Sequence, residues 1–233
     1  MSPLPVQNLL LEELPARASK TIREACELVS LNSGHVLSEP GELIRDVYFP
    51  TECVVSLIAR VSGNACLEVA LVGHEGMAGF PLLLGYDTEP LLAVVQISGE
   101  AWHMKAEAFK PMMEHNFALR RALSKYAFVR LAQLAQNTAC AKIHGLAARL
   151  ARRLLALQDF THGHQFHATQ ESLASMLGVR RSTLTLLAIS FQRKRIIQYS
   201  RGVLTIVDRK ALEALSCECY SFAPTARRAQ KIR

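Results

Sequence analysis

The stretch ASMLGVRRSTLTLLAISFQRKR, residues 174–195, predicts two short helices joined by a tight turn. Thr169 suits the N-cap of the first helix, because its hydroxyl can accept a hydrogen bond from a free backbone N–H. Gly178 can adopt the left-handed conformation that commonly ends a helix. The small Ala174 and the apolar Leu184 lie where the two helices would pack together. Two helices joined by a short turn containing glycine form a helix-turn-helix.

The second helix begins with basic and hydroxyl side chains and ends with three basic residues. In the major groove of DNA, Arg can pair with guanine, while Ser and Thr reach phosphates or base edges. We expect Arg180, Arg193 and Lys194 to contact phosphates, which fix the position of a protein on DNA. Together with the start of the first helix, the candidate DNA-binding residues are Thr169, Gln170, Arg180, Arg181, Ser182, Thr183, Thr185, Arg193 and Lys194.

The next stretch, IIQYSRGVLTIVDRKALEAL, residues 196–215, predicts a β-hairpin followed by a short helix. The turn signal at residues 200–202 places Ser200 and Arg201 at the tip of the hairpin. These two residues are further candidate contacts to the DNA backbone, because a hairpin in this place would form the wing of a winged helix.

The charge of the chain is unevenly distributed, although the whole chain has a net charge of +7. Residues 1–137 contain 11 basic and 15 acidic residues, whereas residues 138–233 contain 16 basic and 5 acidic residues. The C-terminal part therefore has a net charge of +11. A domain with this excess is attracted to polyanions, of which nucleic acid is the leading candidate.

The N-terminal half has the pattern of short strands separated by turns. The runs 35–50, 54–73 and 91–104 are rich in Val, Leu and Ile, and turn residues such as Gly and Pro divide them. Many short strands at such spacing predict an antiparallel barrel or sandwich. Residues 4–31, which precede these strands, predict one or two short helices.

Residues 106–136 contain almost no Gly or Pro and predict a long helix, with an apolar stripe over roughly 25 residues. A symmetric dimer through this stripe is the interpretation that we favour. Packing of the helix on its own barrel is the alternative. The residues expected at the dimer interface are Leu119, Leu123, Ala127, Leu131 and Leu134.

Several features indicate a cytoplasmic protein. The six cysteines are scattered and mostly occupy apolar patterns, which favours a reducing compartment over a disulfide framework. No apolar run reaches the roughly 18 residues that span a bilayer, and the N-terminal residues lack the basic start of a signal peptide. We therefore expect no membrane partner. The sequence also has no nucleophile elbow, phosphate loop or matched pair of carboxylates, so we do not expect an enzyme.

Five segments together resemble the Crp/Fnr family of bacterial transcription regulators, over nearly the full chain. They are VYFPTECVVSL (47–57), VALVGHEGMAGFPLLLG (69–85), RLARRLLAL (149–157), LASMLGVRRSTLTLL (173–187) and YSRGVLTIVDRKALEALSCECY (199–220). The resemblance implies an N-terminal β-roll like that of cyclic-nucleotide-binding domains, a long dimerisation helix and a C-terminal winged helix-turn-helix. Dimers of the family bind near-palindromic operators through successive half-sites in the major groove.

The chain departs from the cyclic-nucleotide sensors of the family at their phosphate site. Those sensors hold the phosphate with a Gly-Glu turn and with an Arg followed by Ser or Thr. Here the turn is residues 73–76, and residues 87–92, Asp-Thr-Glu-Pro-Leu-Leu, offer two carboxylates and no cation. A cyclic nucleotide is therefore not the expected effector.

Other groups could hold a cofactor or a metal, but none has a full set of ligands in the sequence. Cys26, Cys53 and Cys66 are too dispersed for the iron–sulfur cluster of the oxygen-sensing branch, and His74 in its Gly-rich turn is expected to be solvated. Three histidines, His162, His164 and His167, lie close together in one turn and could bind a metal. Near the C-terminus, Cys217 and Cys219 form a C-x-C pair for which the sequence offers no further ligands. We expect no cofactor and no metal.

The second helix of the helix-turn-helix also departs from the family. An acidic residue often follows its first Arg, and a second Arg comes further on, but these positions are Ser182 and Leu186 here. Since Arg181 and Thr183 are kept, the base preference should differ from that of the best-known members. Arg195 replaces a glycine that is usual before the wing, and Arg adopts the left-handed conformation only at a cost.

The expected fold class is α+β, in four parts. They are a β-roll sensor domain (1–110), a dimerisation helix (111–137), a winged helix-turn-helix (138–216) and a flexible basic tail (217–233). The expected function is sequence-specific regulation of transcription by a homodimer that binds double-stranded DNA and contacts RNA polymerase, with an unknown effector.

Two alternatives remain open. One is a constitutive DNA binder whose β-roll is only a scaffold or a contact to RNA polymerase. The other is a metalloenzyme of the cupin type, which would need at least two barrel histidines close in sequence, whereas His35, His74 and His103 lie far apart.

Overall fold

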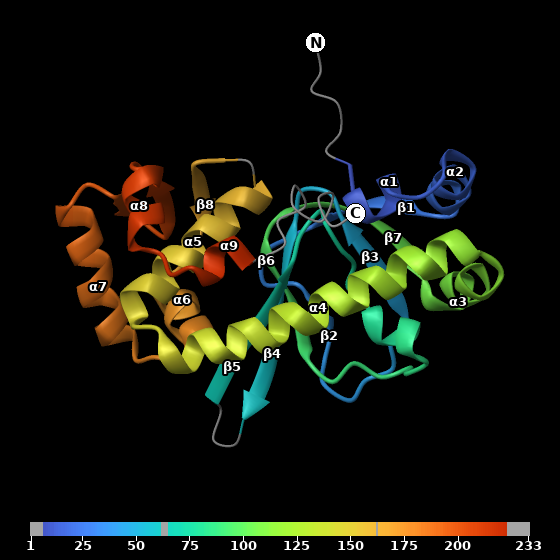
Figure 1. Cartoon of the computed structure of the whole chain (residues 1–233), viewed down its shortest axis with the longest axis horizontal. Coiled ribbons are helices and arrows are strands. Elements are labelled where there is room, and N and C mark those ends of the chain that lie inside the picture. Colours follow the sequence, from blue (N-terminus) through green and yellow to red (C-terminus); the bar gives the residue numbers. More distant parts are fainter. Residues whose placement is uncertain (1–6, 62–64, 162, 223–233) are drawn as a thin grey trace, which may run out of the picture. The chain divides into compact units, whose positions relative to one another are not determined.

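The computed structural model describes residues 7–61, 65–161 and 163–222, which fall into two compact units (Figure 1). Of these residues, 7–57 and 71–132 form the first unit, and 58–61, 65–70, 133–161 and 163–222 form the second. Both contain helices and antiparallel strands, which confirms the α+β class. No helix of the described ranges is long and apolar enough to cross a membrane.

The N-terminal part of the chain, as far as α4, contains two sheets and has helices at both of its ends; the end of β4 and most of β5 belong to the second unit. The four-stranded sheet has the order β2-β6-β4-β5, and a three-stranded sheet has the order β1-β7-β3. The elements are α1 (Leu9–Glu12), α2 (Ala16–Glu24), β1 (Glu27–Leu31), β2 (Val36–Ser38), β3 (Asp46–Pro50), β4 (Val54–Val61), β5 (Ala65–Val72), η1 (Phe80–Leu84), β6 (Leu92–Ile97), β7 (Gly99–Lys105) and α3 (Ala106–His115), followed by α4 (Phe117–Ile143).

The prediction of helices over residues 4–31 is wrong for residues 27–31. This segment forms β1 and pairs antiparallel with β7, from Glu27 opposite His103 to Leu31 opposite Gly99. Strand formation here depends on a partner that lies far away in the sequence, and local propensity does not reveal such a partner.

Two helices, and not one, follow the strands. α3 ends before Asn116, whose side chain accepts a hydrogen bond of 3.0 Å from the backbone N–H of Leu119 and so caps the start of α4. Leu119 and Leu123 are fully buried and pack with Phe49 and Phe109 in the core of their own unit. The prediction that Leu119 and Leu123 lie at a dimer interface is therefore wrong, because no partner could reach them.

The opposite face of α4 carries large apolar side chains that are exposed. Phe117, Phe128 and Leu131 are 69%, 72% and 66% exposed. Together with the exposed Arg121 and Ser124, these residues follow spacings of four, three, four and three. This is the repeat of a two-helix seam, in which every third or fourth residue faces a partner helix. Ala127 and Leu134, which were also predicted at the interface, are half-buried.

The second unit contains the helix pair and the hairpin that the sequence predicts. Its small sheet has the order β8-β10-β9. The elements after α4 are α5 (Leu146–Thr161), β8 (Gln165–His167), α6 (Gln170–Leu177), α7 (Arg181–Arg193), β9 (Ile197–Ser200), β10 (Val203–Ile206), α8 (Arg209–Leu215) and α9 (Cys219–Phe222). Residues 217–222 were predicted to belong to a flexible tail, which is wrong, because Cys217 and Cys219 are buried. Residues 223–233 of that predicted tail lie outside the described residues.

Both helices of the pair end in a left-handed residue. Gly178 has a φ of 64° and Arg195 a φ of 56°. After α7, the N–H of Ile196 bonds to the carbonyl of Phe191 and the N–H of Arg195 to that of Gln192, which is the Schellman pattern of a helix end. Arg195 therefore does adopt the left-handed conformation, which is unfavourable for a residue with a Cβ atom.

Arg195→Gly is expected to stabilise the chain by about 1 kcal/mol, because glycine adopts a positive φ without steric cost. Arg195→Ala removes the same charge but keeps the strain, so it serves as the matched control. Urea denaturation of the three proteins measures the difference. Equal stability of the Gly and Ala variants would contradict the prediction.

Candidate nucleic-acid interface

α7 packs one face on its unit and exposes the other. Leu184, Ala188 and Phe191 are buried, whereas Ser182 and Thr183 are exposed in the first turn. The N-terminal residues of the second helix contact base edges when a helix-turn-helix enters the major groove. The fold therefore presents these side chains where that docking would need them.

Arg181 is exposed and only weakly held. Its Nη1 atom lies 3.6 Å from Oε2 of Glu171, and the two side chains are 67% and 72% exposed. An exposed ion pair contributes less than about 1 kcal/mol, so Arg181 can leave Glu171 for a stronger partner at little cost.

Thr169, Gln170 and Thr185 have structural roles in the isolated chain. The hydroxyl of Thr169 accepts a hydrogen bond of 3.0 Å from Ser172 N, which confirms it as the N-cap of α6. The hydroxyl of Thr185 lies 2.7 Å from Oε1 of Gln170, so this pair joins α7 to α6. These contacts fix the angle between the two helices.

The basic candidates lie at the two ends of α7. Arg180 precedes the helix, and Arg193 and Lys194 close it, and all three are exposed. Positive charge at both ends of a helix in a groove can meet the phosphates on either side of that groove.

Two apolar side chains on α7 were missed as candidate contacts. Leu186 is 71% exposed and Ile189 is 38% exposed. An apolar side chain on a helix in the major groove can contact the methyl group of thymine. The signal was present in the sequence, since Leu186 stands where the resembled family often has Arg.

The hairpin that follows α7 has a two-residue turn. Arg201 and Gly202 both have positive φ values, 49° and 81°, as a type I′ turn requires. Ser200 and Arg201 are exposed at this tip. The hydroxyl of Tyr199 donates to the carbonyl of Ala168, which ties the hairpin to the residues before α6. The structure thus brings the predicted wing residues and the helix pair into one unit.

A buried ion pair lies behind the helix pair. Arg153 of α5 binds Glu68 of β5, and each side chain is only 7% exposed. The same guanidinium donates to Sδ of Met176 in α6, at 3.1 Å. Nearby, Arg149 donates to the carbonyl of Leu177 at 2.7 Å. Two arginines that count toward the basic charge are therefore engaged in contacts within the unit, and Arg153 is buried there.

The sequence of this part of the chain is similar to that of a known domain family. Residues 148–215 match the family model of the Crp-like helix-turn-helix domain. The segment is a Crp-like helix-turn-helix domain. The resemblance to Crp/Fnr regulators that the sequence suggests is thereby confirmed for the DNA-binding part. No curated protein matches the chain.

Solved structures extend the likeness to the whole fold. A transcriptional regulator of the Crp/Fnr family from Eubacterium rectale is 17% identical, with a TM-score of 0.68, over 88% of this chain and 96% of that chain. FixK2 from Bradyrhizobium japonicum is 14% identical, with a TM-score of 0.68, over 82% and 98%. A Crp-family regulator from Thermus thermophilus is 18% identical, with a TM-score of 0.69, over 81% and 96%. The Crp-like domain therefore belongs to a chain with the fold of Crp/Fnr regulators.

The β-roll turn at residues 73–76 is closed by its own contacts. The backbone N–H of Gly73 donates to Oε2 of Glu75 at 3.0 Å, and burial raises the pKa of Glu75 to about 7. His74 is only 9% exposed, and its carbonyl accepts a hydrogen bond of 2.7 Å from Leu9 N. The expectation that His74 is solvated is wrong, because the segment around α1 covers it.

The segment that replaces the phosphate-binding Arg of the cyclic-nucleotide sensors, residues 87–92, carries two carboxyl groups and no Arg. Glu89 is 1% exposed, and burial raises the pKa of its carboxyl to about 7. Asp87 pairs with Lys110 at 2.7 Å. A cyclic phosphate in this place would meet carboxyl groups without a guanidinium to neutralise it.

The barrel histidines do not gather into a metal site in the described part of the chain. His103 lies between Glu27 and Asp46, with a distance of 2.7 Å to each carboxylate, and neither His35 nor His74 joins it. The geometry that a cupin-type enzyme needs is thus not formed by these three residues.

Of the two candidate metal-binding groups in the second unit, the structure adds further ligands to the C-x-C pair and not to the described histidines of residues 162–167. His162 lies outside the described residues, and His164 is hydrogen-bonded to Gln158 at 2.8 Å. Cys217 and Cys219 were expected to lack further ligands, which is wrong. The fold brings Cys140 and His144 beside them, from the end of α4.

Proposed function

We propose that the chain is a cytoplasmic, sequence-specific DNA-binding regulator of transcription that acts as a homodimer. The observation that carries the proposal is the exposed N-terminal face of α7, with Arg181, Ser182 and Thr183, within a Crp-like helix-turn-helix domain. The net charge of +11 on residues 138–233 supports a polyanionic partner. α7 would lie in the major groove, and Ser200 and Arg201 of the hairpin would contact the backbone.

The dimer is proposed to form through the exposed face of α4. Phe117, Phe128 and Leu131 supply its apolar contacts, in place of the buried Leu119 and Leu123. A two-fold axis through this seam would relate two recognition helices, and a two-fold axis of the protein matches a near-palindromic operator.

The β-roll is proposed to respond to an effector other than a cyclic nucleotide, because Glu89 and Asp87 stand where a phosphate would need a cation. An effector would act only by binding one arrangement of the two recognition helices better than another. The alternative is a constitutive DNA binder whose β-roll is a scaffold or contacts RNA polymerase. Addition of cyclic AMP is expected to leave operator affinity unchanged in both cases.

Arg181→Ala tests the role of α7. It should weaken binding to the operator by about 1–3 kcal/mol and relax the preference at one base pair, because Arg in the groove pairs with guanine. Fluorescence anisotropy on the operator and on operators changed at single base pairs measures both effects.

Lys194→Ala is the matched variant for a phosphate contact at the other end of the same helix. It should weaken binding to all duplexes and lower the salt slope by about one unit. If Arg181→Ala also weakens every duplex equally, Arg181 is a phosphate contact and the assignment to base readout fails.

A further inference from the structure

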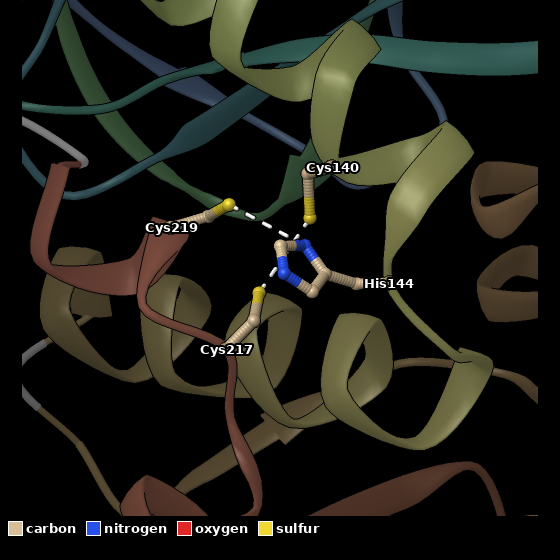
Figure 2. A group of neighbouring side chains, drawn as sticks. All are labelled: Cys140, His144, Cys217 and Cys219. Carbon is tan, nitrogen blue, oxygen red and sulfur yellow. Dashed lines mark hydrogen bonds between the residues drawn. The ribbon is translucent and has the colours of Figure 1, made fainter.

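Four side chains with metal-binding atoms meet at the end of α4, as Figure 2 shows. Cys140 lies in the last turns of α4 and His144 follows it by one turn, while Cys217 and Cys219 stand between α8 and the start of α9. Their three sulfur atoms and one imidazole nitrogen all lie within 4.8 Å of one another. Cys140 and Cys217 are 77 positions apart in the sequence, so folding alone brings them together.

The distances suit one tetrahedral ion. Sγ of Cys140 lies 3.6 Å from Sγ of Cys217, and Nδ1 of His144 lies 3.5 Å from Sγ of Cys219. A zinc ion with bonds of about 2.3 Å to sulfur and about 2.0 Å to nitrogen holds such atoms about 3.5–3.8 Å apart. The group therefore needs only small shifts to enclose an ion, and its size leaves room for one ion and not for a cluster of several.

The surroundings support thiolate ligands. Cys140 and Cys219 are 1% exposed and Cys217 is 7% exposed, so little water competes for the ion. The side-chain amide of Gln136 donates to Sγ of Cys219 at 2.9 Å, which would stabilise negative charge on that sulfur.

His144 is oriented as a metal ligand commonly is. Its Nε2 atom lies 3.1 Å from Oε1 of Glu218, which leaves Nδ1 directed at the sulfurs. A carboxylate that accepts the second ring N–H fixes the tautomer and the ring angle of a metal-binding histidine. Glu218 lies between the two cysteines of the C-x-C pair, so one short segment supplies two ligands and this support.

We propose that Cys140, His144, Cys217 and Cys219 bind one zinc ion in a closed tetrahedral site. Three thiolates and one imidazole favour zinc over magnesium or calcium, which take oxygen ligands. Four protein ligands leave no open position, so the ion holds structure and does not catalyse. It fastens the segment after α8 to the end of α4 within the second unit. The site stands independently of the proposed DNA binding.

The test uses the full chain without a metal-binding tag, purified under reducing conditions without oxygen. Elemental analysis of the purified protein by mass spectrometry is expected to find one zinc ion per chain. After chelation, titration with Co²⁺ should give a thiolate-to-cobalt charge-transfer band and the intense d–d bands of tetrahedral cobalt. Both should reach saturation at one equivalent of Co²⁺, and both should disappear when Zn²⁺ is added. The thermal midpoint of the apoprotein should rise when Zn²⁺ is added, since the ion binds the folded form.

Variants separate ligation from a general loss of structure. Cys219→Ser and His144→Ala should lose the stoichiometric ion, whereas His144→Cys should keep it because a thiolate replaces the imidazole. Glu218→Gln should weaken zinc binding by about 10- to 100-fold. Cys66→Ser, which changes a thiol of the same unit outside the group, should still bind one zinc per chain.

Three results would overturn the proposal. One is a folded apoprotein, judged by circular dichroism, that gives no cobalt–thiolate band. Another is equal loss of zinc in Cys66→Ser. The third is a disulfide between Cys140 and Cys217 in peptides of the protein purified in this way, with no uptake of zinc after its reduction. If Cys219→Ser does not fold, Glu218→Gln and His144→Cys still decide the outcome.

Discussion

Leu131→Glu is expected to convert the proposed dimer into a monomer and to lower operator affinity by about 100-fold or more. Leu131 is 66% exposed on the face of α4 that also bears Phe117 and Phe128. In the proposed interface the new carboxylate would be buried among apolar side chains, and the same charge on the second copy would add repulsion, so association would be strongly unfavourable. Loss of the second half-site then removes the gain of about 10²- to 10⁴-fold that two linked binding modules provide.

Two variants control this result. Leu43→Glu places the same charge on a residue of similar exposure, 61%, away from α4, and should leave the dimer intact. Leu123→Glu charges a fully buried core position and should unfold the first unit. Analytical ultracentrifugation gives the mass, and anisotropy gives the affinity. A folded Leu131→Glu protein that remains dimeric would show that this face is not the interface.

Glu68→Gln is expected to reduce the free energy of unfolding by about 3–5 kcal/mol, because it leaves the buried Arg153 without a counter-charge. The side chains of Glu68 and Arg153 are each 7% exposed, and burial lowers the pKa of Arg153. The guanidinium also bonds Met176 in α6, so the loss falls on the support of the helix pair. Denaturation by urea, followed by circular dichroism, measures the change.

Glu213→Gln breaks the exposed pair with Arg209 and should cost less than about 1 kcal/mol. Replacement of both buried partners, Glu68→Leu with Arg153→Met, should recover most of the lost stability, since a well-packed apolar pair can substitute for a buried ion pair. If Glu68→Gln costs no more than Glu213→Gln, the buried pair has no special role.

The helix pair and its wing were predictable because their signals are local. Gly178 and the turn at Arg201-Gly202 act through their own backbone conformation, and Thr169 caps the helix beside it. These features need no knowledge of the rest of the fold.

The features that were mispredicted depend on distant partners. α4 carries apolar side chains on two faces, and spacing alone does not tell the core face of Leu123 from the exposed face of Phe128. β1 forms because β7 lies beside it. The ligands missing from the C-x-C pair come from Cys140 and His144, more than 70 positions away, and no pattern in the sequence links them.

Selection of bound sequences from random duplex DNA by the purified chain, with no ligand added, tests the proposed regulator most directly. We expect enrichment of a two-fold-symmetric site whose half-sites are about one helical turn apart, as two recognition helices related by a dimer axis require. The site selected by Arg181→Ala should lack a base preference at one position of each half-site. The site selected by Leu131→Glu should no longer be two-fold symmetric. Failure to enrich any sequence, together with binding that does not depend on salt, would contradict a function in DNA recognition.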